Sequence, residues 1–506
     1  MQRRQGSVDP LSMTPMTEAP MTNPRISPFG RFAIVLGAVI LGYLIYYNVT
    51  HLHAGHGEPS VAVLTTPPLW GVGVLPFVFL LASIAILPIL PFTHHWWENN
   101  LNRLMVSLIC ACLTLVYYLF AKGWEALLPM LNHAVPAEYI PFIVLLFSLY
   151  VISGGISLKG DLTARPVTNT GFLAFGALIA SFVGTTGASM LLIRPLLQTN
   201  AHRKHVVHTV VFFIFLVSNI GGCLLPIGDP PLFLGYLRGV EFFWTLNLWT
   251  QWAFSCLLLL VVYYGLDTYF YGKEGAIDRR DDELERQPLR LKGLVNVLWL
   301  GGIVACVATI SHEREFFGTG WTPFPFLREI LMLGFVTLSL WTTPRGVRED
   351  NDFNYAAILE VAALFVGIFI AMQAPIEVLR VYGPKLGLAA PWHFFWATGS
   401  LSSFLDNAPT YVVFFETARS LPIPAGVDVS ATVIEPSLLV GISLGAVFMG
   451  AMTYIGNGPN FMVKAIAEQS GVKMPSFFGY MVKYSIPMLI PVFVIVTLVF
   501  LQGGGG

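Results

Sequence analysis

Charge is scarce in this sequence of 506 residues. Only 11% of them are Asp, Glu, Lys or Arg, less than half of the roughly 25% that is usual in soluble domains. The formal net charge is −1, so the chain has no excess of basic residues that would attract nucleic-acid phosphates. With 55% hydrophobic residues and a mean hydropathy of +0.68, this composition excludes a soluble enzyme, a disordered protein and a nucleic-acid binder. It predicts a protein of the lipid bilayer.

Motifs for catalysis and for cofactor binding are lacking as well. The five cysteines are odd in number and lie in apolar runs, which argues against a disulfide framework. Ser189 lacks the final glycine of a G-x-S-x-G nucleophile elbow, and no Walker, dinucleotide-binding or c-type haem motif occurs. We therefore expect no enzyme activity, no resident metal and no cofactor. The expected energy source is an ion gradient, and the role of His51, His53 and His56 stays open.

Apolar runs long enough to cross a membrane are what the chain has in abundance. They predict an all-α polytopic membrane protein with about 11 transmembrane helices, two re-entrant hairpins and two inverted-topology repeats. The expected parts are a disordered cytoplasmic tail over residues 1–30, a first span and outer loop over 31–68, repeat 1 over 69–271, a cytoplasmic linker over 272–293 and repeat 2 over 294–506.

Each predicted repeat holds one hairpin with a polar interruption and one helix broken by Gly, Asn and Pro. The hairpins are expected at about 168–198 and 389–420, and the broken helices at 206–237 and 436–463. Non-helical backbone at membrane depth is tolerated only where protein or a water-filled cavity surrounds it. Paired interruptions in two inverted halves are the sequence feature that points to the binding site of a secondary transporter.

The distribution of basic residues predicts the orientation. With the N-terminus inside, 20 Lys and Arg residues fall in segments on the cytoplasmic side and 7 fall outside, as the positive-inside rule requires. We expect a multi-pass protein of the cell (inner) membrane whose N-terminus is cytoplasmic.

Short hydroxyl and amide side chains fill the interruptions and supply neutral oxygens, which suit a hard cation such as Na⁺. Any one of these side chains could instead form a hydrogen bond that joins two helices. Their grouping in two matching sets favours an ion-binding site. The candidate ion- and proton-binding residues are Asp229, Asp406, Thr185, Thr186, Ser189, Asn219, Ser403, Asn407, Thr410, Asn457 and Asn460.

Two acids, Asp229 and Asp406, lie in the breaks, one in each half. A carboxylate in a partly dry site can bind either H⁺ or Na⁺, and competition for it is the simplest mechanism of exchange. Asp229 before Pro230 can also be read as a helix cap. Outside the breaks, the accessory candidates are Glu360, Glu416 and Arg194. Asp267 is expected to be solvated near a span end, and His208, at the exit of the first hairpin, is expected to cap and hydrate a helix end.

Three stretches resemble the ion transporter superfamily over about residues 70–500. Gly184–Pro195 and Ser218–Pro231 are similar to the first hairpin tip and the following broken helix of NhaD-type sodium/proton antiporters and of their citrate-transporter (CitMHS-like) relatives. Leu405–Thr410 is similar to the Asp-Asn signature of NhaD-type and arsenite-type (ArsB) members. The resemblance implies two inverted halves, small inorganic cations or citrate as solutes, and a homodimer.

The hairpin tips depart from those of dicarboxylate carriers in the superfamily, which typically carry Ser-Asn-Thr at both. Here the tips are Gly184-Thr185-Thr186 and Leu405-Asp406-Asn407. An added acid repels an organic anion but helps to hold a cation, unless a bound cation reverses the local sign. We therefore expect a sodium/proton antiporter working by alternating access. The alternative is a sodium- or proton-coupled carrier of citrate or another organic anion.

Overall fold

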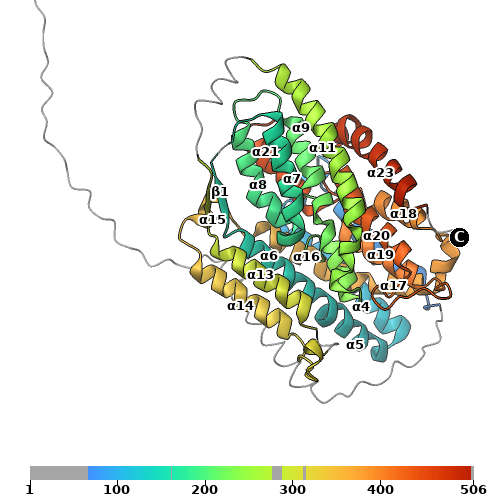
Figure 1. Ribbon diagram of the computed structural model, residues 1–506. Coiled ribbons are helices and arrows are strands. Elements are labelled where there is room, and N and C mark those ends of the chain that lie inside the picture. Colours follow the sequence, from blue (N-terminus) through green and yellow to red (C-terminus); the bar gives the residue numbers. More distant parts are fainter. Residues whose placement is uncertain (1–65, 161, 276–287, 312–314, 503–506) are drawn as a thin grey trace, which may run out of the picture. The chain divides into compact units, whose positions relative to one another are not determined.

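A computed structural model describes residues 66–160, 162–275, 288–311 and 315–502. The predicted tail, the first span and the loop with the three histidines lie outside the described residues, as does most of the linker. Almost all regular structure in the described part is helical (Figure 1). The two short strands, β1 (Ser157–Lys159) and β2 (Arg290–Lys292), pair antiparallel with Leu158 opposite Leu291.

The part predicted as repeat 1 is a chain of helices with two interruptions. Its elements besides β1 are α2 (Trp70–Ile86), α3 (His94–Trp97), α4 (Asn100–Lys122), α5 (Trp124–Asn132), the π-helix η1 (His133–Tyr139), α6 (Ile140–Ser153), α7 (Pro166–Val183), α8 (Thr185–Thr199), α9 (Val207–Leu216), the short 3-10 helix η2 (Ile220–Leu224), α10 (Pro230–Leu237), the 3-10 helix η3 (Phe242–Leu248) and α11 (Trp249–Gly272).

The part predicted as repeat 2 follows β2. Its elements are α13 (Val295–Thr309), η4 (Phe316–Gly318), α14 (Leu327–Thr342), α15 (Val347–Asp350), α16 (Ala356–Ala371), α17 (Gln373–Tyr382), η5 (Gly383–Leu386), α18 (Pro391–Ser402), α19 (Asn407–Arg419), α20 (Pro436–Met449), η6 (Gly450–Met452), α21 (Gly458–Gln469), α22 (Phe477–Tyr480), the π-helix η7 (Met481–Ser485) and α23 (Ile486–Phe500).

Six helices of the described part are long and apolar enough to span a membrane, or seven if the bent pair α16–α17 is one span. Helix α4 has a surface that suits contact with lipid. Large apolar side chains are exposed along it at helical spacing, among them Leu101, Met105, Leu108, Ile109 and Phe120. Such a face is stable against hydrocarbon and unfavourable in water. The all-α polytopic class is therefore confirmed, and the figure of about 11 spans stays a prediction.

The chain breaks where the polar interruptions predict it. Gly184, with φ of +78°, joins α7 to α8, a backbone angle at which glycine avoids the strain of a side chain. Helix α10 packs on α19, and α21 packs on α8, so each broken helix meets the hairpin of the other half. Two inverted repeats would produce this reciprocal packing, but the repeat boundaries stay a prediction.

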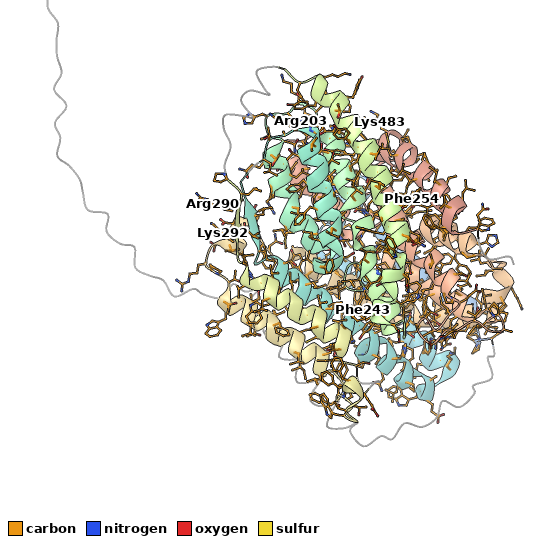
Figure 2. All side chains as sticks on the ribbon, viewed as in Figure 1. Arg203, Phe243, Phe254, Arg290, Lys292 and Lys483 are labelled. Atoms are coloured by element: carbon orange, nitrogen blue, oxygen red, sulfur yellow. The ribbon has the colours of Figure 1, made fainter. Side chains whose placement is uncertain are left out.

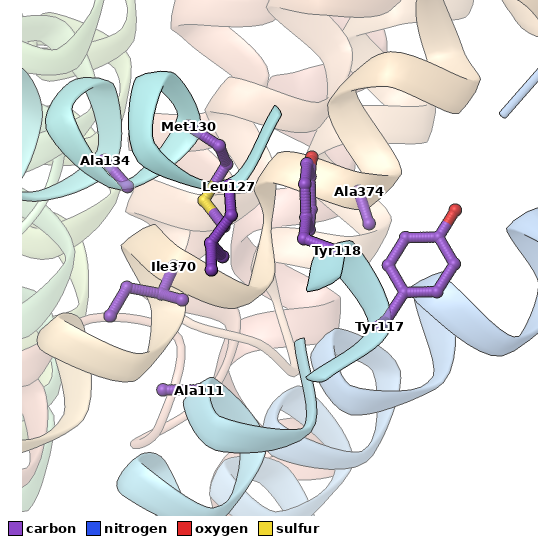
Figure 3. Packing of buried hydrophobic residues seen from close by; sticks show 8 residues of the cluster. All are labelled: Ala111, Tyr117, Tyr118, Leu127, Met130, Ala134, Ile370 and Ala374. Carbon is purple, nitrogen blue, oxygen red and sulfur yellow. The ribbon is translucent and has the colours of Figure 1, made fainter. Parts of the chain in front are cut away.

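Apolar packing and ion pairs hold segments from the two halves together. One buried cluster brings Tyr118 of α4 and Met130 of α5 against Ile370 of α16 and Ala374 of α17 (Figure 3). Ion pairs join segments that the predicted topology puts on the same side, for example Arg103 with Glu360 at 2.6 Å. The labelled Arg203 and Lys483 lie near one end of α11, and Phe243 lies near the other (Figure 2), in agreement with that topology.

Candidate functional site

Four helices begin around one buried carboxylate, that of Asp229. Helix α8 starts at Thr185, α10 follows Asp229 itself, α19 starts at Asn407, and α21 follows Asn457. In each case the helical hydrogen bonding begins at a break in the chain, which leaves the first backbone N–H groups of the helix without partners within it. The breaks predicted from the sequence therefore meet at one place in the fold.

Asp229 is the centre of the hydrogen bonds between these helix ends. Its side chain is buried, with 1% exposed. Thr185 Oγ1 donates to Asp229 Oδ1 at 2.9 Å, and Asn457 Nδ2 donates to the same oxygen at 3.0 Å. Asn407 Nδ2 donates to Asp229 Oδ2 at 2.7 Å. The carboxylate therefore has charge-assisted partners from both halves of the chain, as burial of a charge requires.

The four residues of this centre form two matched pairs. Asp229 and Asn457 each follow a glycine and immediately precede the helix after a break. Thr185 and Asn407 are each the first residue of the second helix of a hairpin. An acid thus occupies one of two matching positions and a neutral amide occupies the other, so the centre has one ionisable group.

A second layer of amides lies beside the centre. Asn219 Nδ2 donates to Asn460 Oδ1 at 2.7 Å, and Asn457 Nδ2 is 3.3 Å from Asn219 Oδ1. Asn460 Nδ2 in turn donates to the backbone oxygens of Gly450 and Thr453 in the second break. These bonds satisfy carbonyl groups that the broken helix leaves open. Asn219 and Asn460 thus lie beside the centre and fix its geometry, whereas their role in ion binding stays a prediction.

The electrostatics of the site favour negative charge in its middle. Each helix N-terminus carries a partial positive charge of roughly half an elementary charge, and four of them point to one region. Asp229 supplies one negative charge there when it is ionised. Asn407 Oδ1 is buried and has no hydrogen-bond partner among the described residues. A neutral oxygen of this kind can accept a hydrogen bond or coordinate a cation.

Other predicted residues bond elsewhere. Asp406 is half-buried and caps α19, where Oδ1 accepts a bond from the Ala408 N–H at 3.0 Å. The hydroxyls of Ser403 and Thr410 donate to backbone oxygens of Gly399 and Asp406. These three contacts are local to the hairpin.

The two remaining hydroxyl candidates belong to the first hairpin. Ser189 Oγ and Ser218 Oγ lie 2.8 Å apart, so Ser189 joins α8 to the first break. Thr186 is half-buried, and within the described residues its hydroxyl shows no hydrogen bond. Neither side chain contacts the Asp229 carboxylate directly.

The accessory candidates are separate from the centre. Glu360 pairs with Arg103, and Arg194 pairs with Asp352 at 3.1 Å. Glu416 contacts Arg238 and Arg380 at 3.6 and 3.2 Å. Glu416 and Arg194 are each the tenth residue of the second hairpin helix, so they occupy equivalent places in the two halves.

The expectation that Asp267 is solvated is wrong. Its side chain is fully buried; Arg203 Nη2 lies 2.6 Å and His208 Nε2 lies 2.7 Å from its Oδ1. His208, expected at a hydrated helix end, is buried too. A charged side chain near a helix end can be covered by neighbouring helices, and a hydropathy pattern along one segment does not contain that information.

A buried ion pair that sequence reasoning missed joins Glu138 of η1 to Arg238, which follows α10. Arg238 Nη2 lies 2.5 Å from Glu138 Oε1, and both side chains are 5% exposed. Gln373 Nε2 also donates to Glu138, at 3.1 Å. The available signal was the placement of both charges at span ends on the same predicted side of the membrane.

The comparisons with known proteins agree with this arrangement. The family model described as "Putative citrate transport" matches residues 66–501, which includes both hairpins and both broken helices. Among curated proteins no match is found. The matched family is a family of transporters and not of enzymes, so the expectation of a non-enzyme transporter is confirmed. The chain belongs to this CitMHS-like family of transporters.

Proposed function

We propose that the chain carries citrate or a related small organic anion across the membrane, coupled to Na⁺ or H⁺. The observation that carries this proposal is the convergence of four helix N-termini on one buried region. Such ends favour carboxylate groups of a substrate. The family description supports the same solute class.

Asp229 is the coupling residue in this proposal. Its negative charge already balances part of the positive potential of the helix ends. Binding of Na⁺ or H⁺ at the carboxylate would remove that charge and make room, electrostatically, for the anion. Asn407 Oδ1, which lacks a partner within the described residues, is the neutral oxygen placed to complete a cation site. In this proposal, cation binding and anion binding are coupled because both change the net charge around Asp229.

Sodium/proton exchange is the second candidate, and Asp229 is the observation that favours it. A built-in carboxylate with three side-chain donors can hold a cation or a proton without any organic anion. In that case the helix ends would stabilise Asp229 alone.

One experiment separates the two. The purified chain is reconstituted in proteoliposomes, and uptake of labelled citrate is measured with an inward Na⁺ gradient, an inward H⁺ gradient or neither. Internal pH is followed in parallel under a Na⁺ gradient without citrate. We expect gradient-driven citrate uptake. Proton movement driven by Na⁺ alone, without citrate uptake, would instead establish the exchanger.

A further inference from the structure

A second polar site lies away from Asp229, between β1, α8 and α15. It is a cavity of about 290 Å³, lined among others by Lys159, Arg194, Gln198, Asp350 and Asn351. Figure 2 labels Lys292, which is on β2 next to this site, at the edge of the described part. The predicted topology puts β1, β2 and the end of α8 on the cytoplasmic side. None of the cavity residues contacts Asp229 directly.

The charges around the cavity leave it positive. Asp350 accepts from two lysines, Lys159 at 2.8 Å and Lys292 at 3.1 Å. Hydrogen bonds from these lysines lower the pKa of Asp350 below its ordinary value, so it stays ionised but is more than balanced. Among the described residues Arg194 has one acidic partner, Asp352, whose side chain is 78% exposed. Three cations and two anions give this group a net charge of +1.

The two neutral polar side chains of the cavity wall have different roles: one holds the wall in place and the other is available to a ligand. Asn351 Nδ2 donates to the backbone oxygens of Gly154 and Ile156, at 3.0 and 2.6 Å, and so fixes the wall. Gln198 lies one helical turn after Arg194, on the same face of α8. The surface available to a ligand therefore combines a guanidinium, an ammonium and an amide, which is the donor set that recognises carboxylates.

We propose that this cavity binds a compact organic anion with at least two negative charges. Lys159 and Arg194 hold its charged groups, Gln198 donates to it, and the ligand replaces the exposed Asp352 as the partner of Arg194. An exposed ion pair contributes only about 0–1 kcal/mol, so its replacement costs little. The volume is at the lower end of the roughly 300–1,000 Å³ range of ligand pockets, which fits a di- or tricarboxylate and excludes a nucleotide.

The cavity is connected to Asp229 by one helix, α8. Helix α8 begins with Thr185, which donates to Asp229, and carries Arg194 nine residues later, a distance of roughly 14 Å along the axis. A ligand that holds Arg194 therefore holds the first hairpin. The binding claim is independent of the transported solute, whereas this effect on flux rests on the proposed function. The ligand is either the transported anion in transit or a separate effector of the same chemistry.

A cysteine placed in the cavity wall tests binding without measuring transport. Cys112 is exposed and the other four cysteines are buried, so the full chain with Cys112→Ser is the background. Leu191 lines the cavity without contributing a polar group; Leu191→Cys is the reporter, labelled with a maleimide in detergent. We expect citrate to slow the labelling. Arg345→Cys, an exposed position not among the cavity residues, is the matched control and should not be protected.

Charge removal gives the decisive comparison. Adding Lys159→Gln or Arg194→Gln to the reporter should raise the citrate concentration for half-protection by about tenfold, because a charge-assisted bond is lost. Adding Asn457→Ala at the Asp229 centre should abolish flux but leave protection intact. Protection lost with Asn457→Ala, unchanged by both charge removals, or absent for citrate would overturn the proposal.

The same variants show whether the ligand is the transported anion or a separate effector. If the protecting anion is also the one accumulated in proteoliposomes, the cavity is a transit site. If it protects the reporter and changes the rate of flux without being accumulated, it is an effector. Binding without citrate transport would disprove the proposed function while leaving the cavity assignment standing.

Discussion

Asn407 donates a hydrogen bond of 2.7 Å to Asp229, although 178 residues separate the two along the chain. The bond joins the first turn of α19, the second helix of the second hairpin, to the break of the first broken helix. It therefore links the two halves at the point where the helix ends converge. Alternating access requires the two halves to move relative to each other. Such a movement either breaks the hydrogen bond between Asn407 and Asp229 or moves both residues together.

The first prediction ranks the two acids of the breaks. Asp229→Asn keeps the shape of the side chain but removes the charge that the helix ends and three donors stabilise, so we expect loss of gradient-driven uptake by about 100-fold or more. Asp406→Asn should reduce uptake far less, because Asn also serves as a helix cap. Uptake in proteoliposomes checks both variants, and the reverse order would remove Asp229 from the coupling role.

The second prediction concerns the energy of the contact between the halves. In a double-mutant cycle with Asp229→Asn and Asn407→Ala, we expect a coupling energy of about 0.5–3 kcal/mol, as is typical of residues in one hydrogen-bond network. Unfolding of the purified chain in detergent is the measurement. Asp229→Asn with Asn351→Ala is the control cycle, since Asn351 bonds to Gly154 and Ile156 instead. Additive effects in the first cycle would contradict the assignment.

The third prediction concerns the buried pair of Arg238 and Glu138. Arg238→Gln would leave the carboxylate of Glu138 buried without its guanidinium, at a cost of about 3–5 kcal/mol, whereas Glu416 would keep Arg380 at 3.2 Å. Lys464→Gln, in the more exposed pair with Glu468, should cost about 0–1 kcal/mol. Thermal unfolding in detergent compares the two variants. Equal effects would show that the Arg238 pair is hydrated and not buried.

The fourth prediction is a pH dependence of stability at Asp350. Hydrogen bonds from Lys159 and Lys292 lower its pKa in the folded state below the ordinary value of 3.8. The stabilisation is present above the unfolded-state pKa and is lost as the pH falls through the folded-state pKa. Unfolding of the wild type and of Asp350→Asn is measured between about pH 3 and pH 7. We expect the difference between them to shrink toward the acid end; a constant difference would refute the ion-pair origin.

The fifth prediction concerns the tip of the first hairpin. Gly184 has φ of +78° and ψ of 148°, a region that is essentially confined to glycine, so Gly184→Ala should lower the free energy of unfolding by about 1–3 kcal/mol through backbone strain. Gly171→Ala, inside α7 where an added Cβ meets no atom within 4 Å, should be neutral or stabilising by up to about 1 kcal/mol. Unfolding in detergent measures both. A harmless Gly184→Ala would mean that the tip relaxes to another backbone angle.

Much of the local structure was predictable from the residues alone. The scarcity of charge and the apolar runs gave the membrane class, because lipid leaves a chain of this composition only helices as a spanning form. The polar interruptions at Gly184 and at Asn457 marked real breaks in helices. Proline and glycine within a run of polar residues disfavour continued helical hydrogen bonding through the residues next to them in the chain.

The sequence by itself determined that this is a membrane protein, that it is helical and where its helices break, since these properties depend on residues close together in the chain. Only the tertiary structure decided that Asp229, and not Asp406, lies among donors from both halves, and that Asp267 is buried with Arg203. Both outcomes depend on which distant helices pack together. Hydropathy and spacing describe one segment at a time, so they leave the partners of a buried charge open.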